Sequence, residues 1–178
     1  MRNIYIVKLL KLLQRHNKNP SNSETSKMSF SNLFSSDHLV YRALENTAED
    51  QELFTRFILS DPTSYAHGIH LLMQPPSSES IKNTIEWLNG LLSVTICLPS
   101  TGESPASCLN PVPIGWLSLT AHSETRHHRS CSLSITVFSP HQGRGYGTEA
   151  ISWGLDWAFR IAGLHSVYVL YPYNFWEP

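Results

Sequence analysis

A glycine-rich turn between two regular runs is the part of this sequence whose residue types and spacing best suit chemistry. The turn is Gln142–Thr148, and it carries glycine at every second position, Gly143, Gly145 and Gly147. Glycine has no Cβ, so the backbone can curl tightly there and present several N–H groups to one anion. A helix that begins at the end of the turn directs its positive dipole end to the same point. The spacing therefore predicts a phosphate-binding turn whose contacts come from the backbone.

Two well-known phosphate-binding motifs do not fit this turn. The P-loop needs Lys and then Ser or Thr after its last glycine, whereas Gly147 is followed by Thr148 and Glu149. The dinucleotide fingerprint has two residues between its second and third glycines, whereas Tyr146 alone separates Gly145 from Gly147. An ordinary tight turn stays open as an alternative, because glycines also mark turns that bind nothing.

Regular elements must hold the turn in place, and the hydrophobic periodicity predicts them. Apolar residues alternate with polar ones in several runs, which is typical of antiparallel strands with one apolar face. Apolar residues spaced three and four apart predict helices. We expect strands at 38–44, 93–98, 116–121, 131–138 and 166–171, and helices at 47–61, 80–91 and 148–164. The predicted fold class is therefore α+β, with a mostly antiparallel sheet flanked by helices.

The start of the chain differs in composition from the rest. Residues 1–18 carry five basic side chains and no acid, and residues 17–31 are polar and rich in serine. We expect 1–36 to be a disordered extension and 37–178 to form one domain with its own core. A cytoplasmic protein with such an extension is the favoured interpretation, and a mitochondrial transit peptide is the alternative. The apolar run within the extension is too short and too interrupted to span a membrane.

The net charge, the histidine spacing and the cysteine count argue against several kinds of binding site. A formal net charge of -1 predicts no general affinity for nucleic acid or for an anionic membrane. The nine histidines lack ligand spacing, and the adjacent pair His127 and His128 would point to opposite faces of a strand. The three cysteines are odd in number, which favours reduced thiols in an intracellular protein. We therefore expect neither a metal site nor a disulfide framework.

The turn and its flanks resemble the GNAT superfamily of acyl-CoA-dependent N-acetyltransferases. Gln142, Gly145 and Gly147 match its pattern of Gln or Arg, two residues, Gly, one residue, and Gly or Ala. The flanking strand, long helix and further strand are similar to the branch that includes the ribosomal-protein N-terminal acetyltransferases. The resemblance covers about Leu39 to Asn174 and lacks the family's last helix and final strands, so the chain looks truncated at its carboxyl end. An incomplete edge of this kind predicts self-association.

The resemblance implies that acetyl-CoA is the donor and that the amides of the turn hold its pyrophosphate. The implied donor-binding residues are Val137, Gln142, Gly143, Arg144, Gly145, Tyr146, Gly147, Thr148 and Asn174. Among them, the backbone of Val137 would hydrogen-bond the acyl carbonyl, and Asn174 would lie near the pantetheine arm. A fixed donor at the acyl oxygen stabilises the charge that develops there during acyl transfer.

The resemblance also implies direct attack of a primary amine on the thioester, without a covalent enzyme intermediate. The acceptor would be a peptide amino terminus, a lysine-like side chain or a small amine. Ser132 stands where the branch often has Glu, and a hydroxyl cannot replace a carboxylate as general base. His128 is a second, weak candidate for the base. A non-catalytic CoA-binding or interaction protein derived from an acetyltransferase is the alternative function, and turnover would separate the two.

Overall fold

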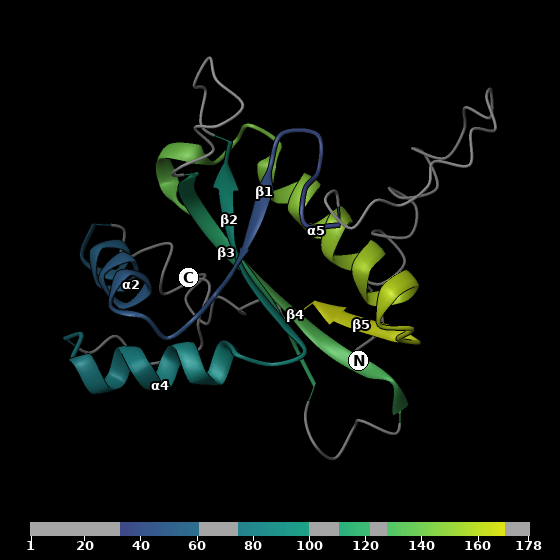
Figure 1. The fold of residues 1–178 in the computed structure, drawn as a ribbon, viewed down its shortest axis with the longest axis horizontal. Helices are drawn as coiled ribbons and strands as arrows, with labels where there is room; N and C mark the ends of the chain where they lie inside the picture. The colour runs from purple at the N-terminus through teal and green to yellow at the C-terminus, as the bar shows by residue number, and fades with distance from the viewer. Residues whose placement is uncertain (1–32, 61–74, 100–110, 122–127, 170–178) are drawn as a thin grey trace, which may run out of the picture. The chain divides into compact units, whose positions relative to one another are not determined.

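A five-stranded sheet in the order β1-β2-β3-β4-β5 organises the fold (Figure 1). The computed structural model describes residues 33–60, 75–99, 111–121 and 128–169, which belong, apart from Leu33, to the unit Phe34–Pro178. In order, the strands are Val40–Ala43, Leu92–Leu98, Val112–Thr120, Ser130–Val137 and Ser166–Val169. The first four are antiparallel neighbours, and β5 runs parallel to β4. The predicted α+β class with a mostly antiparallel sheet is confirmed.

Helices cover both faces of this sheet. They are α2 (Ala48–Ser60), α4 (Ser78–Leu88) and α5 (Tyr146–Asp156), with the 3-10 turn η3 (Ser139–His141) before α5 and the π-helix η4 (Trp157–Ile161) after it. On one face, Phe54 of α2 stacks on Trp116 of β3 with ring centroids 4.3 Å apart. On the other face, a Cβ added to Gly154 of α5 would meet Leu117 and Leu133 at 3.1 Å and 3.7 Å. We call these the α2/α4 face and the α5 face, and Figure 1 shows α5 on the side of the sheet away from α2 and α4.

A buried carboxylate anchors α2 to the first strand. Asp50 is fully buried and accepts hydrogen bonds from Arg42 Nη2 at 2.6 Å and from the N–H of Glu45 at 2.9 Å. The N–H of Asp50 donates to Thr47 Oγ1 at 3.3 Å, as an N-cap residue requires. Since a buried charge is stable only when it is paired, this cluster fixes how the helix meets β1.

The second helix begins and ends earlier than its periodicity predicts. Ser77 and Ser80 form a reciprocal capping box, so the helix begins at Ser78 rather than at position 80. Beyond its end, Gly90 passes so close to β3 that a Cβ would lie 2.7 Å from the Leu119 carbonyl oxygen. The chain has therefore already joined the sheet where the sequence predicts the last turn of the helix.

The helix after the glycine turn also differs from the predicted 148–164. It begins at Tyr146, after Gly145 in the left-handed conformation, and it continues as the π-helix η4. A π-helical turn holds more residues than an α-helical turn, so later side chains leave the predicted apolar stripe. Phe159 is accordingly 42% exposed, whereas the neighbouring Ala158 is buried.

Candidate functional site

The glycine turn leaves the sheet at the end of β4 and leads directly into α5. Gly143 and Gly145 have φ angles of 73° and 87°, in the left-handed region that favours glycine. A Cβ built on either residue would meet nothing within 4 Å, so the space beside both is open. Gly147 does not have a positive φ, and its Cβ would meet Val137 Cγ2 at 3.8 Å, an ordinary contact. The backbone conformation therefore demands glycine at two of the three positions.

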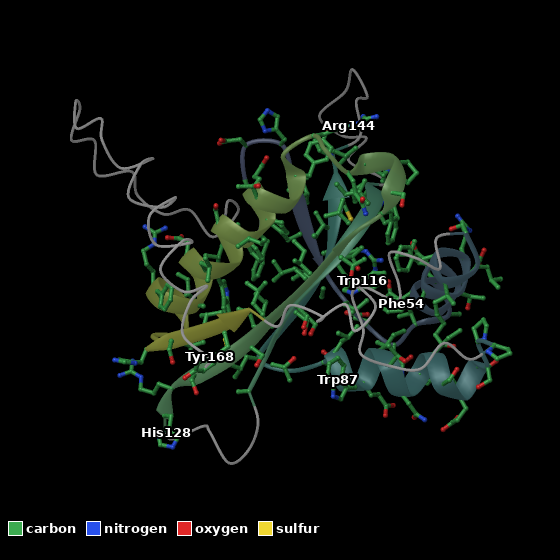
Figure 2. All side chains as sticks on the ribbon, turned by 180° about the vertical axis from the view of Figure 1, so that it is seen from behind. Phe54, Trp87, Trp116, His128, Arg144 and Tyr168 are labelled. Atoms are coloured by element: carbon green, nitrogen blue, oxygen red, sulfur yellow. The ribbon has the colours of Figure 1, made fainter. Side chains whose placement is uncertain are left out.

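Consecutive N–H groups gather where the turn becomes a helix. The first helical hydrogen bond runs from the N–H of Glu149 to the Gly145 carbonyl oxygen at 3.1 Å. The N–H groups from Gly143 to Thr148 donate to no backbone carbonyl of the described residues. Arg144 is exposed beside them, as Figure 2 shows. Unpaired N–H groups and the helix dipole together favour an anion, and an arginine adds charge-assisted hydrogen bonds.

The side chain of Gln142 ties the turn to the outer edge of β4. Its Nε2 donates to the Val137 carbonyl oxygen at 2.7 Å. The N–H of the next residue, Phe138, donates to the Ile114 carbonyl oxygen at 2.8 Å. Backbone groups of successive strand residues point to opposite sides, so the N–H and C=O of Val137 point away from β3. The turn and this edge of the sheet are therefore joined directly.

The same edge of β4 has no strand partner beside the turn, as far as the described residues show. Pairing between β4 and β5 ends at Leu133 and Val169, whereas β4 continues to Val137. The backbone groups of Ile135 and Val137 that point away from β3 therefore face no described strand. An extended ligand can bind such an edge through the hydrogen bonds that an added strand would make.

A carboxylate in the first turn of α5 joins that helix to the segment before β1. Glu149 accepts hydrogen bonds from Ser36 Oγ at 2.6 Å and from the N–H of His38 at 2.8 Å, and His38 Nδ1 lies 3.1 Å from its second oxygen. Burial opposes the negative charge, but the bonds from Ser36 and His38 outweigh it and lower the pKa of Glu149. The partners lie 113 and 111 residues earlier, so no local pattern in the sequence indicates this contact.

The predicted catalytic candidates do not gather at the turn. His128 is exposed just before β4, and Figure 2 shows it at the opposite end of that strand from Arg144. Ser132 lies within β4, half-buried, opposite Thr120 of β3 and Tyr168 of β5. The remaining donor-binding candidate after the turn, at position 174, lies outside the described residues. The structure thus brings together Val137 and the turn, whereas Ser132 lies elsewhere along β4 and His128 lies just before that strand.

The described cysteines are unsuited to nucleophilic chemistry. Burial raises the pKa of Cys97 to about 11, and it does the same to Cys131. Both thiols therefore stay protonated near neutral pH, and a protonated thiol is a poor nucleophile. In the described ranges, no three His, Cys, Asp or Glu side chains are grouped as metal ligands, and no helix is long and apolar enough to cross a membrane.

The fold and the turn together define an acetyltransferase domain of the GNAT type. Residues 38–172 match the family model described as "Acetyltransferase (GNAT) domain", so the chain belongs to this family. No curated protein gives a significant match to the chain.

Solved structures of acetyltransferases share this fold. An acetyltransferase of the GNAT family from Bacillus anthracis is 16% identical, with 76% of this chain and 71% of that chain covered and a TM-score of 0.56. A protein from Vibrio cholerae described as a "putative ribosomal-protein-serine acetyltransferase" is 18% identical, with 79% of this chain and 75% of that chain covered and a TM-score of 0.55. A chimera of the spermidine N-acetyltransferase from Vibrio cholerae is 22% identical, with 74% and 69% covered and a TM-score of 0.52. At these identities the likeness concerns the fold.

Proposed function

We propose that the chain is an acetyl-CoA-dependent N-acetyltransferase that transfers the acetyl group to a primary amine. The supporting observation is the turn, in which Gly143 and Gly145 are left-handed and the space beside them is open. The N–H groups from Gly143 to Thr148 donate to no backbone carbonyl within the described ranges. The turn lies within a domain of the acetyltransferase family, whose members use acetyl-CoA. Acetyl-CoA would supply the thioester carbonyl that the amine attacks.

The residues of the turn and of β4 have separate roles in this proposal. The N–H groups of Gly143–Thr148 suit the pyrophosphate, and Arg144 adds a positive charge. The N–H of Val137 faces outward from the edge of β4 and suits the acyl oxygen, where negative charge develops during attack. Gln142 holds the carbonyl of the same residue, so the strand and the turn keep one relative position.

The acceptor in this proposal is a peptide amino terminus, a lysine-like side chain or a small amine. Affiliation with the ribosomal-protein branch is part of the proposal and favours the first of these. Two proteins of the same fold are described by different acceptors, a ribosomal-protein serine and spermidine. The fold alone therefore does not select the acceptor.

Thermal unfolding with acetyl-CoA tests donor binding. A ligand at 100 times its Kd stabilises a protein by about 2.7 kcal/mol, which raises the Tm of a domain of this size by roughly 5–10 °C. Gly145→Asp should abolish this shift, because its carboxylate would repel the pyrophosphate. Gly145→Asn is the matched control, since Asn has the same size, tolerates the left-handed conformation and carries no charge.

Two results would contradict the proposal. The first is that acetyl-CoA does not shift the Tm of the wild-type chain. The second is that the Gly145→Asn and Gly145→Asp variants retain the Tm shift equally. If acetyl-CoA binds, release of free thiol in the presence of amines measures turnover. If acetyl-CoA binds but no amine causes release of its thiol, a non-catalytic CoA-binding protein is favoured instead.

A further inference from the structure

The carboxylate of Glu149 belongs to a residue from which it could reach the N–H groups of the glycine turn. Helix α5 begins at Tyr146, so Glu149 is in its first turn. A glutamate in the first turn of a helix can accept a hydrogen bond from the N–H three residues earlier, as the glutamate of a capping box does. For Glu149 that N–H belongs to Tyr146, one of the groups that suit the pyrophosphate. A carboxylate bound there would compete with the donor for the same site.

In the structure this carboxylate is bound instead by the segment 34–39 before β1. One of its oxygens accepts from Ser36 Oγ at 2.6 Å and from the N–H of His38 at 2.8 Å, and the other lies 3.1 Å from His38 Nδ1. Within the described residues, neither oxygen accepts from an N–H of the turn. A hydroxyl, a backbone N–H and an imidazole therefore hold one carboxylate, and none of the three belongs to the turn.

The segment 34–39 also has attachments that do not involve Glu149. The N–H of Tyr41 donates to the Phe34 carbonyl oxygen at 2.9 Å, so the segment folds back on β1. The ring of Tyr41 stacks on Trp153 of α5 with centroids 3.7 Å apart, and the ring of Phe34 lies 6.4 Å from the same indole. Figure 1 shows the segment alongside α5. Removal of the side chains that bind Glu149 should therefore release the carboxylate without detaching the segment.

A second hydroxyl strengthens the contact between Ser36 and Glu149. The phenol oxygen of Tyr41 lies 3.0 Å from Ser36 Oγ. Since an ionised carboxylate can only accept, Ser36 donates to Glu149 and therefore accepts from Tyr41. Burial raises the pKa of Tyr41 to about 12, so the phenol keeps its proton near neutral pH. Hydrogen bonds in such a chain polarise one another, so the hydroxyl of Ser36 holds the carboxylate more strongly than an isolated hydroxyl would.

We propose that Ser36 and His38 are positioning residues for donor binding, because they hold the carboxylate of Glu149 away from the N–H groups at the start of α5. This inference rests on the proposed acetyl-CoA site and adds residues that act on that site through Glu149. The interaction of one charge with a helix terminus corresponds to about a two- to fivefold change in a binding constant. Release of the carboxylate should weaken donor binding by a factor of this size.

A double-mutant cycle on the affinity for acetyl-CoA tests the inference. In the wild-type background, Ser36→Ala combined with His38→Ala should raise the Kd, measured by isothermal titration calorimetry, by about two- to fivefold. In the Glu149→Gln background the same two substitutions should leave the Kd nearly unchanged. The reason is that a neutral amide competes for N–H groups less strongly than a carboxylate does. Glu149→Gln alone should leave the Kd unchanged or lower it.

Tyr41→Phe provides a milder test in the same assay. It keeps the ring that stacks on Trp153 and removes only the hydroxyl that donates to Ser36. The Kd should rise by a smaller factor than with the double variant, and this rise should also disappear in the Glu149→Gln background. Each titration is made at a temperature at which circular dichroism shows the variant to be folded.

Three results would overturn the inference. The first is an equal rise in Kd in both backgrounds, because the substitutions would then act through the fold of the segment and not through Glu149. The second is an unchanged Kd of the double variant in the wild-type background. The third is a Glu149→Gln variant that binds acetyl-CoA as weakly as the double variant does. Failure of the wild-type chain to bind acetyl-CoA would instead overturn the proposed function, and the inference with it.

Discussion

Replacement of Gly145 by alanine should destabilise the protein even without a ligand. Gly145 has a φ of 87°, and a Cβ there would meet nothing within 4 Å, so the cost is conformational rather than steric. The left-handed conformation costs an L-residue about 1–2 kcal/mol. Since 1 kcal/mol shifts the Tm of a domain of this size by roughly 2–4 °C, Gly145→Ala should lower the Tm by about 2–8 °C.

Gly147→Ala is the matched control within the same turn. Gly147 does not have a positive φ, and its Cβ would lie 3.8 Å from Val137 Cγ2. Alanine is preferred over glycine in a helix by up to about 1 kcal/mol, and Gly147 is in the first turn of α5. This variant should therefore keep the wild-type Tm or raise it by up to about 4 °C.

Circular dichroism melts of the two variants without acetyl-CoA are the measurement. The Tm of Gly145→Ala should be lower than that of the wild type, whereas the Tm of Gly147→Ala should not be lower. Equal losses in both would refute it, because position in the turn, and not the left-handed backbone, would then set the need for glycine. An unchanged Tm in both would show that the turn relaxes at no cost, which would contradict its role as a rigid anion site.

Two further predictions concern carboxylates that hold elements together. Glu149→Gln should lower the free energy of unfolding by about 1–2 kcal/mol near neutral pH. The pKa of Glu149 is lowered in the folded state, so the extra stability of the wild type over Glu149→Gln should be complete above the ordinary pKa of 4.5. It should be lost as the pH falls through the folded-state pKa. Urea unfolding at several pH values measures this difference in the free energy of unfolding. Asp50→Ala should cost about 3–5 kcal/mol, because Arg42 loses its buried partner. The exposed Glu52→Ala, which breaks a surface ion pair, should cost less than about 0.5 kcal/mol in the same denaturant assay.

Alternation predicted which stretches are strands, but it could not set the register between them. The strand β3 begins at Val112, four residues before the predicted start at 116. Pro113 argues against a strand when the sequence is considered alone, because proline cannot donate to a ladder. In the structure a bulge between Ile96 and Cys97 shifts the pairing, so that Cys97 lies opposite Pro113. Such a bulge depends on two strands at once, and no single run of sequence encodes it.

The glycine turn was predictable because its requirement for glycine is local. Gly143 and Gly145 need a positive φ that their own spacing suggests, and the helix that follows has a clear period. The attachment of Glu149 to Ser36 and His38 was not predictable, because it joins segments far apart in the chain. The polar face of β4 was predictable only in part, since alternation places Ser132, Ser134 and Thr136 together but says nothing of what covers them.

The contact between Gln142 and Val137 orders the segment that leads from β4 into the glycine turn. The hydrogen bond of 2.7 Å links the two ends of the segment 137–142, which contains η3, and so closes this segment into a ring. Residues inside such a ring lose their conformational freedom when the protein folds, rather than when a ligand arrives. Binding to a preorganised loop is stronger, because less ordering accompanies it. Gln142 would thus contribute to donor affinity without contacting the donor, and its amide would act through the rigidity of the loop.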